Sequence, residues 1–322
     1  MKALITGITG MAGSFLAEYL LTCGDEICGT SRRGNWPPYL SAELGARVRL
    51  FAWDGAKPFG HELQSALAEF APDCIFHLAA LSVPADCGWP EPTPLADAVN
   101  VGGTEAVCRL AASLPDTPRV VLASSCHVYG EVDAKNPVVA EDVPLCPAGG
   151  YGKTKLAAEQ VLRRSRRELG VDGVIARLFH HTGPRQMPRL LVPQWARQLV
   201  AAGSEPIRIL TRDAQLDLCD VRDVARAYRL LAMRRSSGDD PDAFNVGSGI
   251  AVRCGDLLDE MYRLCRSQRE VIETSPGVRQ NPIADASRIR RETGWRPAIP
   301  LEQTLRDTLE FWRSRPFGAA LE

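Results

Sequence analysis

The first turn of the chain restricts the fold more than any other segment. A short apolar run at residues 2–6 is followed by Gly7, Gly10 and Gly13, and apolar residues then recur at helical spacing over 14–22. Glycine is needed where a backbone turns sharply toward a pyrophosphate, and the N-terminus of the next helix offers free N–H groups. We therefore predict a dinucleotide-binding turn rather than a glycine-rich turn of purely structural origin. The residues expected to form it are Thr6, Gly7, Gly10, Met11 and Gly13.

Short apolar runs and helical patterns alternate along the first half of the chain. The expected strands are 2–6, 26–30, 48–52, 73–78, 119–123 and 173–178, and the expected helices are 14–22, 61–69, 100–113 and 151–169. Strands that alternate with helices indicate an α/β fold with a doubly wound parallel sheet. After Leu178 the pattern loosens into loops around shorter helices, which are expected at 193–202, 221–234, 254–267, 287–293 and 301–312.

This change of pattern predicts two parts. We expect a large cofactor-binding domain over 1–178 and 217–248, and a smaller C-terminal substrate lobe over 179–216 and 249–322.

Charge and cysteine usage exclude several classes of partner. Lys and Arg number 38 against 39 Asp and Glu, so there is no basic excess for nucleic acid or an anionic membrane surface. No uncharged apolar run approaches the roughly 20 residues of a membrane span, and no signal peptide is recognisable. We expect a cytoplasmic protein. The ten cysteines are scattered singly and the five histidines form no chelating pair on a helix, so no metal site is expected.

The residues after the second expected strand bear on the cofactor. A carboxylate there would bind the 2′-hydroxyl of an adenosine ribose, whereas this chain reads Ser31-Arg32-Arg33. An arginine can bind a 2′-phosphate through two hydrogen bonds. The sequence therefore favours NADP, with NAD possible if these arginines are only solvated loop charges. Asp54, after the third expected strand, is placed to accept a hydrogen bond from an adenine amino group.

A phenol and an ammonium are expected on one helix face. Tyr151 and Lys155 are four residues apart, and Ser125 follows a strand at the edge where such sheets bind ligands. A nearby lysine cation would favour the phenolate and lower the pKa of Tyr151 toward neutrality. A serine hydroxyl could orient a carbonyl group beside the phenol. This combination predicts proton transfer at a carbonyl oxygen.

Several motifs together resemble one superfamily. They are residues 6–13 (TGITGMAG), 77–80 (HLAA), 100–104 (NVGGT), 124–130 (SSCHVYG), 151–155 (YGKTK), 220–224 (DVRDV), 245–249 (NVGSG) and 294–297 (GWRP). Over nearly the whole chain they are similar to the extended short-chain dehydrogenase/reductases. Within that superfamily the chain most resembles the GDP-mannose 4,6-dehydratases and GDP-4-keto-6-deoxy-D-mannose reductases.

The resemblance implies a Rossmann domain, a bound nicotinamide dinucleotide and a nucleotide-linked sugar as substrate. It assigns Ser125, Tyr151 and Lys155 to catalysis, with Tyr151 and Lys155 also at the cofactor. Further cofactor contacts are implied for Leu78, Ala79, Ala80 and Asn100. Such proteins are commonly homodimers, here through the helices that begin near 100 and 151.

The reaction is expected to be a reduction. The similar dehydratases have a glutamate, often after an aspartate, shortly beyond the serine, whereas this chain has Cys126 and His127. We therefore expect an NADP(H)-dependent reductase of a 4-keto-6-deoxy sugar nucleotide, GDP-linked by preference. A 4-epimerase, an atypical dehydratase with His127 as its base, and a non-catalytic NADP-binding regulator are the alternatives.

The substrate side departs from the resemblance. His180 stands where relatives have asparagine, and Leu216 and Ser275 stand where they have arginines that would clasp a pyrophosphate. Other arginines in the same loops could compensate or could be exposed charges. The predicted substrate-binding residues are Ser125, His127, His180, Arg185, Arg212 and Arg279.

Overall fold

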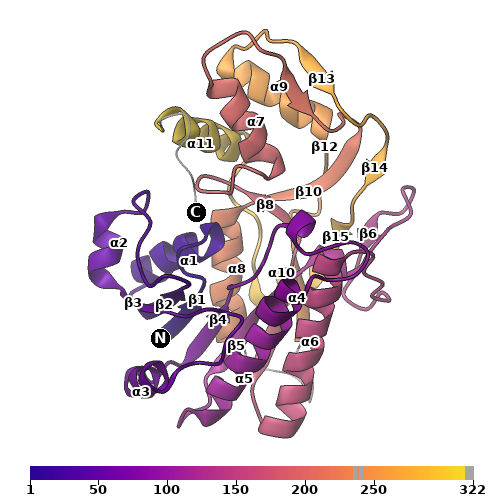
Figure 1. The fold of residues 1–322 in the computed structure, drawn as a ribbon. Helices are drawn as coiled ribbons and strands as arrows, with labels where there is room; N and C mark the ends of the chain where they lie inside the picture. The colour runs from indigo at the N-terminus through magenta and orange to yellow at the C-terminus, as the bar shows by residue number, and fades with distance from the viewer. Residues whose placement is uncertain (235–237, 239–241, 316–322) are drawn as a thin grey trace.

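A seven-stranded parallel sheet forms the centre of the protein, with strand order β11-β7-β5-β4-β1-β2-β3. The computed structural model describes residues 1–234, 238 and 242–315 (Figure 1). The strands of this sheet are β1 (Lys2–Thr6), β2 (Glu26–Ser31), β3 (Arg49–Ala52), β4 (Cys74–His77), β5 (Arg119–Ser125), β7 (Gly173–Leu178) and β11 (Asp242–Val246). This is the Rossmann-like α/β fold that the alternating pattern predicts.

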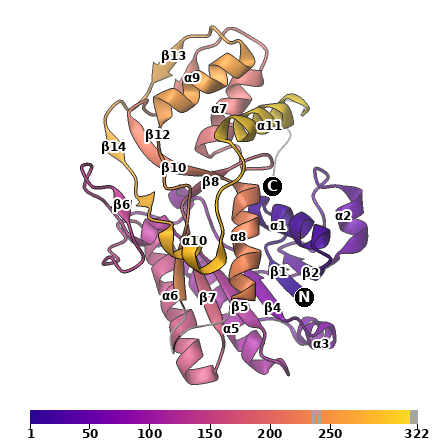
Figure 2. The same cartoon turned by 180° about the vertical axis from the view of Figure 1, so that it is seen from behind.

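Helices cover both faces of the sheet (Figures 1 and 2). On one face α5 (Gly103–Ser113) packs beside α6 (Gly150–Leu169), and on the other α1 (Met11–Thr22) packs beside α8 (Val221–Met233). The remaining helices beside this sheet are α2 (Ala42–Arg47), α3 (His61–Phe70), α4 (Pro94–Ala96) and α10 (Ser287–Thr293).

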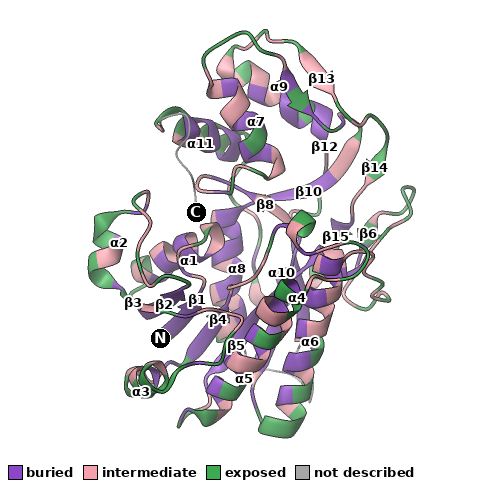
Figure 3. Ribbon diagram, in the orientation of Figure 1, coloured by how far each residue is buried: buried purple, intermediate pink, exposed green. Residues whose placement is uncertain are grey.

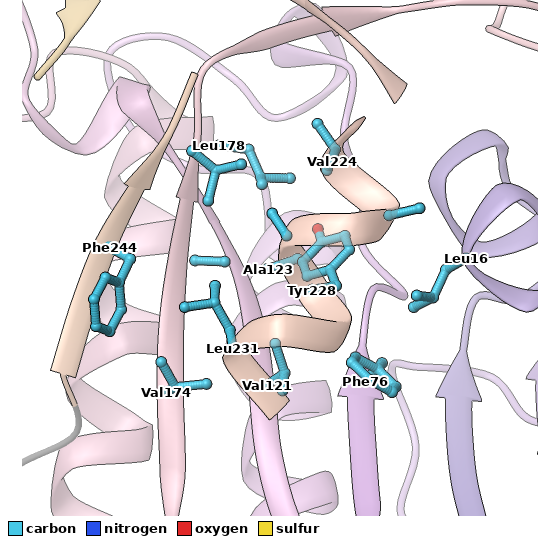
Figure 4. Packing of buried hydrophobic residues seen from close by; sticks show 14 of the residues in the cluster. Leu16, Phe76, Val121, Ala123, Val174, Leu178, Val224, Tyr228, Leu231 and Phe244 are labelled. Carbon is cyan, nitrogen blue, oxygen red and sulfur yellow. The ribbon is translucent and has the colours of Figure 1, made fainter. Parts of the chain in front are cut away.

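Alternate residues of each strand enter different cores, because successive side chains point to opposite faces of a sheet. Val121 packs in one cluster with the α8 residues Tyr228 and Leu231 (Figure 4), whereas its neighbours Val120 and Leu122 pack in the cluster that holds α5 and α6. The central strands β1, β4, β5 and β7 are therefore buried on both sides, which explains their continuous apolar sequences.

A second layer lies beyond the carboxyl ends of the strands. Its sheet has the order β12-β10-β14, with β8 also paired to β10. Three helices pack around a third apolar core there, and Figure 3 shows their buried inner sides. The elements of this part are β8 (His180–Thr182), α7 (Leu191–Val200), β9 (Ile207–Ile209), β10 (Ala214–Asp220), β12 (Ala251–Arg253), α9 (Cys254–Cys265), β13 (Val271–Glu273), β14 (Arg279–Gln280) and α11 (Leu301–Arg313). A further short pair, β6 (Val138–Val139) with β15 (Ile283–Ala284), joins distant segments.

The expected helices are all found, one of them (287–293) with its expected bounds and the others with one or both ends shifted, and several strands were not expected. The helix expected from Asn100 begins instead with a π-helical turn, Asp97–Gly102, before α5. β10 and β11 lie in segments for which no strand was predicted. None of the helices described for this chain has both the length and the apolar character that crossing a membrane requires.

Candidate active site

The glycine-rich turn has no room for a Cβ atom at two of its three glycines. Gly7 has a φ of +71°, and a Cβ atom there would lie 2.8 Å from the backbone nitrogen of Ala79. A Cβ on Gly13 would lie 2.4 Å from the carbonyl oxygen of Gly7. At Gly10 the nearest atom would be 3.3 Å away. Glycine is therefore required at positions 7 and 13 for the chain to turn this tightly between β1 and α1.

The N-terminus of α1 fits an anionic group. Gly10 caps the helix and, within the described part of the chain, no side chain accepts a hydrogen bond from the first-turn N–H groups. The positive end of the helix dipole and these N–H groups favour a phosphate. The turn and the helix start thus have the form expected of a dinucleotide cradle, with Met11 as the first helical residue.

The turn after β4 is fastened to the glycine turn. Thr6 Oγ1 lies 2.8 Å from His77 Nδ1 and accepts a hydrogen bond of 3.2 Å from the backbone N–H of Ala79. Asn100 is 2% exposed and exchanges two hydrogen bonds with the backbone of Leu81, at 2.8 and 3.1 Å. Asn100 therefore positions the segment that contains the predicted cofactor residues Leu78, Ala79 and Ala80.

The predicted adenosine residues lie beyond β2 and β3. Ser31 is buried and its Oγ accepts a hydrogen bond of 3.0 Å from the backbone N–H of Gly34, which closes a turn that carries Arg32 and Arg33 exposed. Asp54 is half-buried and accepts a hydrogen bond of 3.1 Å from the backbone N–H of Ala56. Both arginines therefore lie next to the edge where the dinucleotide turn begins.

Ser125, Tyr151 and Lys155 come together at the end of β5. Ser125 is the last residue of β5, and Tyr151 and Lys155 lie one turn apart near the start of α6. The Nζ atom of Lys155 lies 5.9 Å from the centroid of the Tyr151 ring and donates a hydrogen bond of 2.9 Å to the carbonyl oxygen of Ala123. Burial lowers the pKa of Lys155 to about 8.

The pKa of Tyr151 is shifted in the opposite direction to the sequence prediction. Burial raises it above the ordinary tyrosine value, and a hydrogen bond with Ser125 offsets this only in part. The expected lowering of the Tyr151 pKa by Lys155 is wrong for this structure, because the loss of hydration of a phenolate is the largest cause of the shift and Lys155 is not among its causes. The phenol therefore holds its proton at neutral pH and is suited to donate it.

A cavity of about 380 Å³ begins at these residues and extends into the second layer. Ser125, His127 and Tyr151 line one end, and Arg279 and Asn281 line another part. Among the described lining residues Arg279 is the only arginine or lysine, and none is an acid. Much of the remaining wall is apolar, with leucines at 190, 191, 210, 216 and 218.

Two histidines face each other in this cavity. The His127 ring lies edge-on to Tyr151, with centroids 5.2 Å apart, and to His180, with centroids 5.8 Å apart. His127 Nδ1 is 3.0 Å from Ser125 Oγ. Burial lowers the pKa of His127 and lowers that of His180 to about 3, so both rings are neutral at physiological pH.

Only one of the three arginines predicted to bind substrate lines the cavity. Arg279 lines the cavity and donates a hydrogen bond of 2.8 Å to Ser275 Oγ. Arg185 is not a lining residue and pairs with Glu18 of α1 at 2.8 Å. Arg212 is not a lining residue either, and pairs with Asp259 at 2.5 Å.

A buried charged network behind Ser125 was not predicted. Glu159 of α6 accepts hydrogen bonds from Arg177 of β7 at 3.0 and 2.9 Å and from Ser124 Oγ at 2.6 Å. Arg177 also donates a hydrogen bond of 3.1 Å to the Tyr129 hydroxyl. The one sequence signal is an arginine inside the apolar strand 173–178, because a buried charge requires a partner.

Comparison with models of known protein families shows which family this chain belongs to. The family model described as the NAD dependent epimerase/dehydratase family matches residues 3–247. The chain belongs to this family. The predicted resemblance to extended short-chain dehydrogenase/reductases is thereby confirmed, as is the prediction of an enzyme with a nicotinamide cofactor.

Relatives in this family carry out different reactions. The chain is 27% identical to the GDP-6-deoxy-D-mannose reductase of Pseudomonas aeruginosa, with 98% of each chain covered. It is 30% identical to the UDP-glucose 4-epimerase of Mycolicibacterium smegmatis, over 98% of this chain and 99% of the relative. The structure of RMD from Pseudomonas aeruginosa complexed with NADPH has a TM-score of 0.79 at 22% identity, covering 98% of this chain and 99% of that one. Family membership thus leaves reduction, epimerisation and dehydration to be distinguished.

Proposed function

We propose that this enzyme is an NADP(H)-dependent reductase of a 4-keto-6-deoxy sugar nucleotide, with the GDP-linked sugar as the preferred substrate. The observation that carries the proposal is the Tyr151 phenol, which lines the end of the cavity beside Ser125 and whose pKa is raised by desolvation, so that it keeps its proton at neutral pH. Reduction of a ketone needs such a proton donor next to a group that holds the carbonyl oxygen.

Each residue has a distinct role in this reaction. The Ser125 hydroxyl donates a hydrogen bond to the 4-keto oxygen, and Tyr151 gives that oxygen its proton as the alcohol forms. Lys155 is fixed by the carbonyl of Ala123 next to Tyr151, where its charge binds the ribose hydroxyls of the cofactor. When bound, the reduced nicotinamide supplies the hydride for the carbonyl carbon.

NADP is proposed over NAD because of the turn after β2. Ser31 holds the turn and Arg32 and Arg33 are exposed at its tip, where a carboxylate would bind a 2′-hydroxyl. Two cations suit a 2′-phosphate. The NADPH complex with a similar fold supports this choice.

The substrate is proposed to lie between Ser125 and Arg279. Arg279 and His180 both line the cavity, and we assign Arg279 to a substrate phosphate and His180 to a polar group nearer the sugar. On this view residues 1–178 and 217–248 bind the cofactor, and 179–216 and 249–322 bind the substrate.

A UDP-sugar 4-epimerase is the second candidate, favoured by the relative at 30% identity. Cofactor stoichiometry separates the two. Purified enzyme is given NADPH or NADH with GDP-, UDP- and dTDP-linked 4-keto-6-deoxy sugars, and cofactor oxidised is compared with alcohol formed. In a parallel assay the enzyme is given UDP-glucose with NAD⁺ or NADP⁺. A reductase oxidises one cofactor per alcohol and prefers NADPH and the GDP-linked sugar. Conversion of UDP-glucose to its 4-epimer without net cofactor oxidation would identify an epimerase instead.

We also propose a homodimer in which α5 and α6, packed together on one outer face, meet the same helices of a second copy. Light scattering on the eluted protein should give twice the 35.1 kDa mass of the chain. A monomeric mass over the micromolar range would contradict this assembly.

A further inference from the structure

The segment that joins β8 to α7 is attached to both sides of the crevice at the end of the central sheet. β1 and β4 are neighbours in that sheet, but the chain after β1 enters α1 on one face and the chain after β4 leads to α5 on the other. Sheets of this kind bind ligands where adjacent connections leave toward opposite faces. The segment 183–190 is held to α1 through Arg185 and to the chain after β4 through Arg189, so it crosses this crevice.

The Arg185 end of this segment is firmly anchored. Its guanidinium pairs with Glu18 at 2.8 Å, donates a hydrogen bond of 3.3 Å to Ser14 Oγ, and has its Cζ atom 4.4 Å from the centroid of the Phe15 ring. Arg185 also has a φ of +68°, a left-handed conformation that a non-glycine residue keeps only where surrounding contacts hold it. Three residues of α1 therefore fix the start of the segment.

The middle of the segment borders the substrate cavity. Gln186 is 8% exposed, and its Nε2 atom donates a hydrogen bond of 2.9 Å to the carbonyl oxygen of His181. Its Oε1 atom accepts a hydrogen bond of 2.6 Å from Thr182 Oγ1. Gln186 and Leu190 line the cavity, as does Ser82 in the chain after β4. The segment therefore lies beside the cofactor crevice and the substrate cavity at once.

The Arg189 end is held by an exposed ion pair. The Nη1 and Nη2 atoms of Arg189 donate hydrogen bonds of 2.9 and 2.8 Å to the two carboxylate oxygens of Asp86, the last residue of the short 3-10 helix Pro84–Asp86. The arginine and aspartate side chains are 58% and 34% exposed, so water can replace this contact at little cost and the pair can open. A bidentate arginine–carboxylate contact also has a defined geometry, so the pair closes in one position.

We propose that residues 183–190 form a strap over the bound cofactor, fixed at Arg185 and closed by a latch, the Asp86–Arg189 pair, which must open before the dinucleotide enters or leaves. This inference rests on the proposed place of the cofactor between the glycine turn and residues 78–81. A reductase exchanges its oxidised cofactor for a reduced one at each turnover, so a latch that opens easily suits this reaction. Because the latch is made by the chain's own residues, removing it should speed entry and exit alike.

Stopped-flow fluorescence of the reduced nicotinamide tests the latch. Enzyme is mixed with NADPH to time association, and the complex is mixed with excess NADP⁺ to time release, with NADH and NAD⁺ used in parallel. Asp86→Asn and Arg189→Gln each remove one charge of the latch. Both variants should bind and release the cofactor about two- to fivefold faster, the scale of a single exposed ion pair. The Kd should change by less than either rate.

The direction of the Asp86→Asn effect separates a latch from general electrostatics. Loss of an acid makes the surroundings of an anionic cofactor more positive, which by itself slows release, whereas the latch predicts faster release. In the double variant Asp86→Asn/Arg189→Gln the effects should not add, because both changes remove the same contact. Glu260→Gln is the control and should change neither rate. Glu260 pairs with Arg263 in α9, and these side chains are 31% and 59% exposed, much like those of the latch.

The outcomes distinguish this inference from the proposed function. Slower or unchanged release in Asp86→Asn, or effects that add in the double variant, overturn the latch. A raised Kd without faster association shows a damaged binding site and overturns it as well. Both rates raised as predicted, in an enzyme that reduces none of the keto sugars, support the latch and contradict the reductase assignment. Reduction by an enzyme whose release neither variant changes overturns the latch and leaves that assignment standing.

Discussion

The Oγ atom of Ser124 donates a hydrogen bond of 2.6 Å to Oε1 of Glu159. This bond joins the end of β5 to α6, immediately before Ser125 and one helical turn after Lys155. Glu159 and its partner Arg177 have side chains only 1% and 3% exposed. The Ser124–Glu159 hydrogen bond therefore holds together β5 and α6, the two elements that carry the predicted catalytic groups, and the ion pair joins α6 to β7.

Removal of this charge should destabilise the protein strongly. Glu159→Gln leaves Arg177 buried without its counter-charge, and breaking one partner of a buried pair costs about 3–5 kcal/mol. Denaturant unfolding should show this loss in the free energy of unfolding. The control is Glu105→Gln, which removes the pair of Glu105 with Arg164, whose side chains are 40% and 50% exposed. That change should cost less than about 1 kcal/mol. Equal losses in the two variants would contradict the structural role given to Glu159.

The raised pKa of Tyr151 predicts different pH profiles for the two directions of the reaction. Reduction uses the protonated phenol, which burial maintains through neutral and mildly alkaline pH, so this group should not limit its rate there. Oxidation of the alcohol needs the phenolate, so its rate should rise with pH across the same range when both substrates saturate. A plateau of the oxidation rate near neutral pH would contradict the raised pKa.

The variant Tyr151→Phe tests whether Tyr151 is the proton donor. It removes the phenolic hydroxyl and retains the ring, so turnover should fall about 100-fold or more while cofactor binding persists. A non-catalytic cofactor-binding regulator would keep its behaviour in this variant. Native turnover in Tyr151→Phe would show that another group donates the proton.

Gly13 should be intolerant of a side chain. In Gly13→Ala the Cβ would lie 2.4 Å from the Gly7 carbonyl oxygen and 2.7 Å from Ile8 Cα, so the backbone must shift at the dinucleotide turn. Fluorescence titration should show NADPH binding weakened about tenfold or more, a loss of about 1.4 kcal/mol. Gly60→Ala is the control, because this glycine lies at the N-cap of α3 and has no atom within 4 Å of its Cβ position. Unchanged NADPH binding by a folded Gly13→Ala protein would refute the claim that the dinucleotide turn has no room for a side chain at position 13.

The cofactor preference should reside in the turn after β2. Arg32→Ala removes a cation from the proposed 2′-phosphate site, and the loss of a charge-assisted hydrogen bond of about 1.5–3 kcal/mol should raise the Kd for NADPH about 10- to 100-fold. The Kd for NADH should change little. Arg208→Ala, an exposed arginine on β9, is the control for general loss of charge. An equal effect of Arg32→Ala on both cofactors would place the 2′-phosphate elsewhere.

The first half of the fold is predictable because its signals are local. The apolar strand 2–6, the glycines of the next turn and the pair Tyr151 and Lys155 lie within short stretches, and each element repeats a known pattern. β10 and β11 are harder to predict. β10 alternates apolar and polar residues and places Asp217 in the interior, where the backbone N–H groups of Ser248, Gly249 and Ala284 donate to it. The partners that permit a buried acid come from distant segments.

Contacts between distant segments also limit how much of the site can be predicted from the sequence. Ser125 and His127 are close in sequence, and their contact follows from the short helix that begins at Cys126. The partners of Arg185 and Arg212 come instead from other elements, and a loop arginine gives no sign of whether it meets a ligand or an acid. The pKa of Tyr151 depends on burial by tertiary packing, which the spacing to Lys155 does not reveal.

Transfer of deuterium tests the central claim most directly. The enzyme is given the GDP-linked 4-keto-6-deoxy sugar and NADPH that carries deuterium at both C4 positions, and the product is examined by NMR and mass spectrometry. The reductase assignment predicts one deuteron on the new carbinol carbon and one NADP⁺ formed per alcohol. An alcohol that contains no deuterium from the cofactor, or recovery of the ketone with all deuterium still on NADPH, would contradict it.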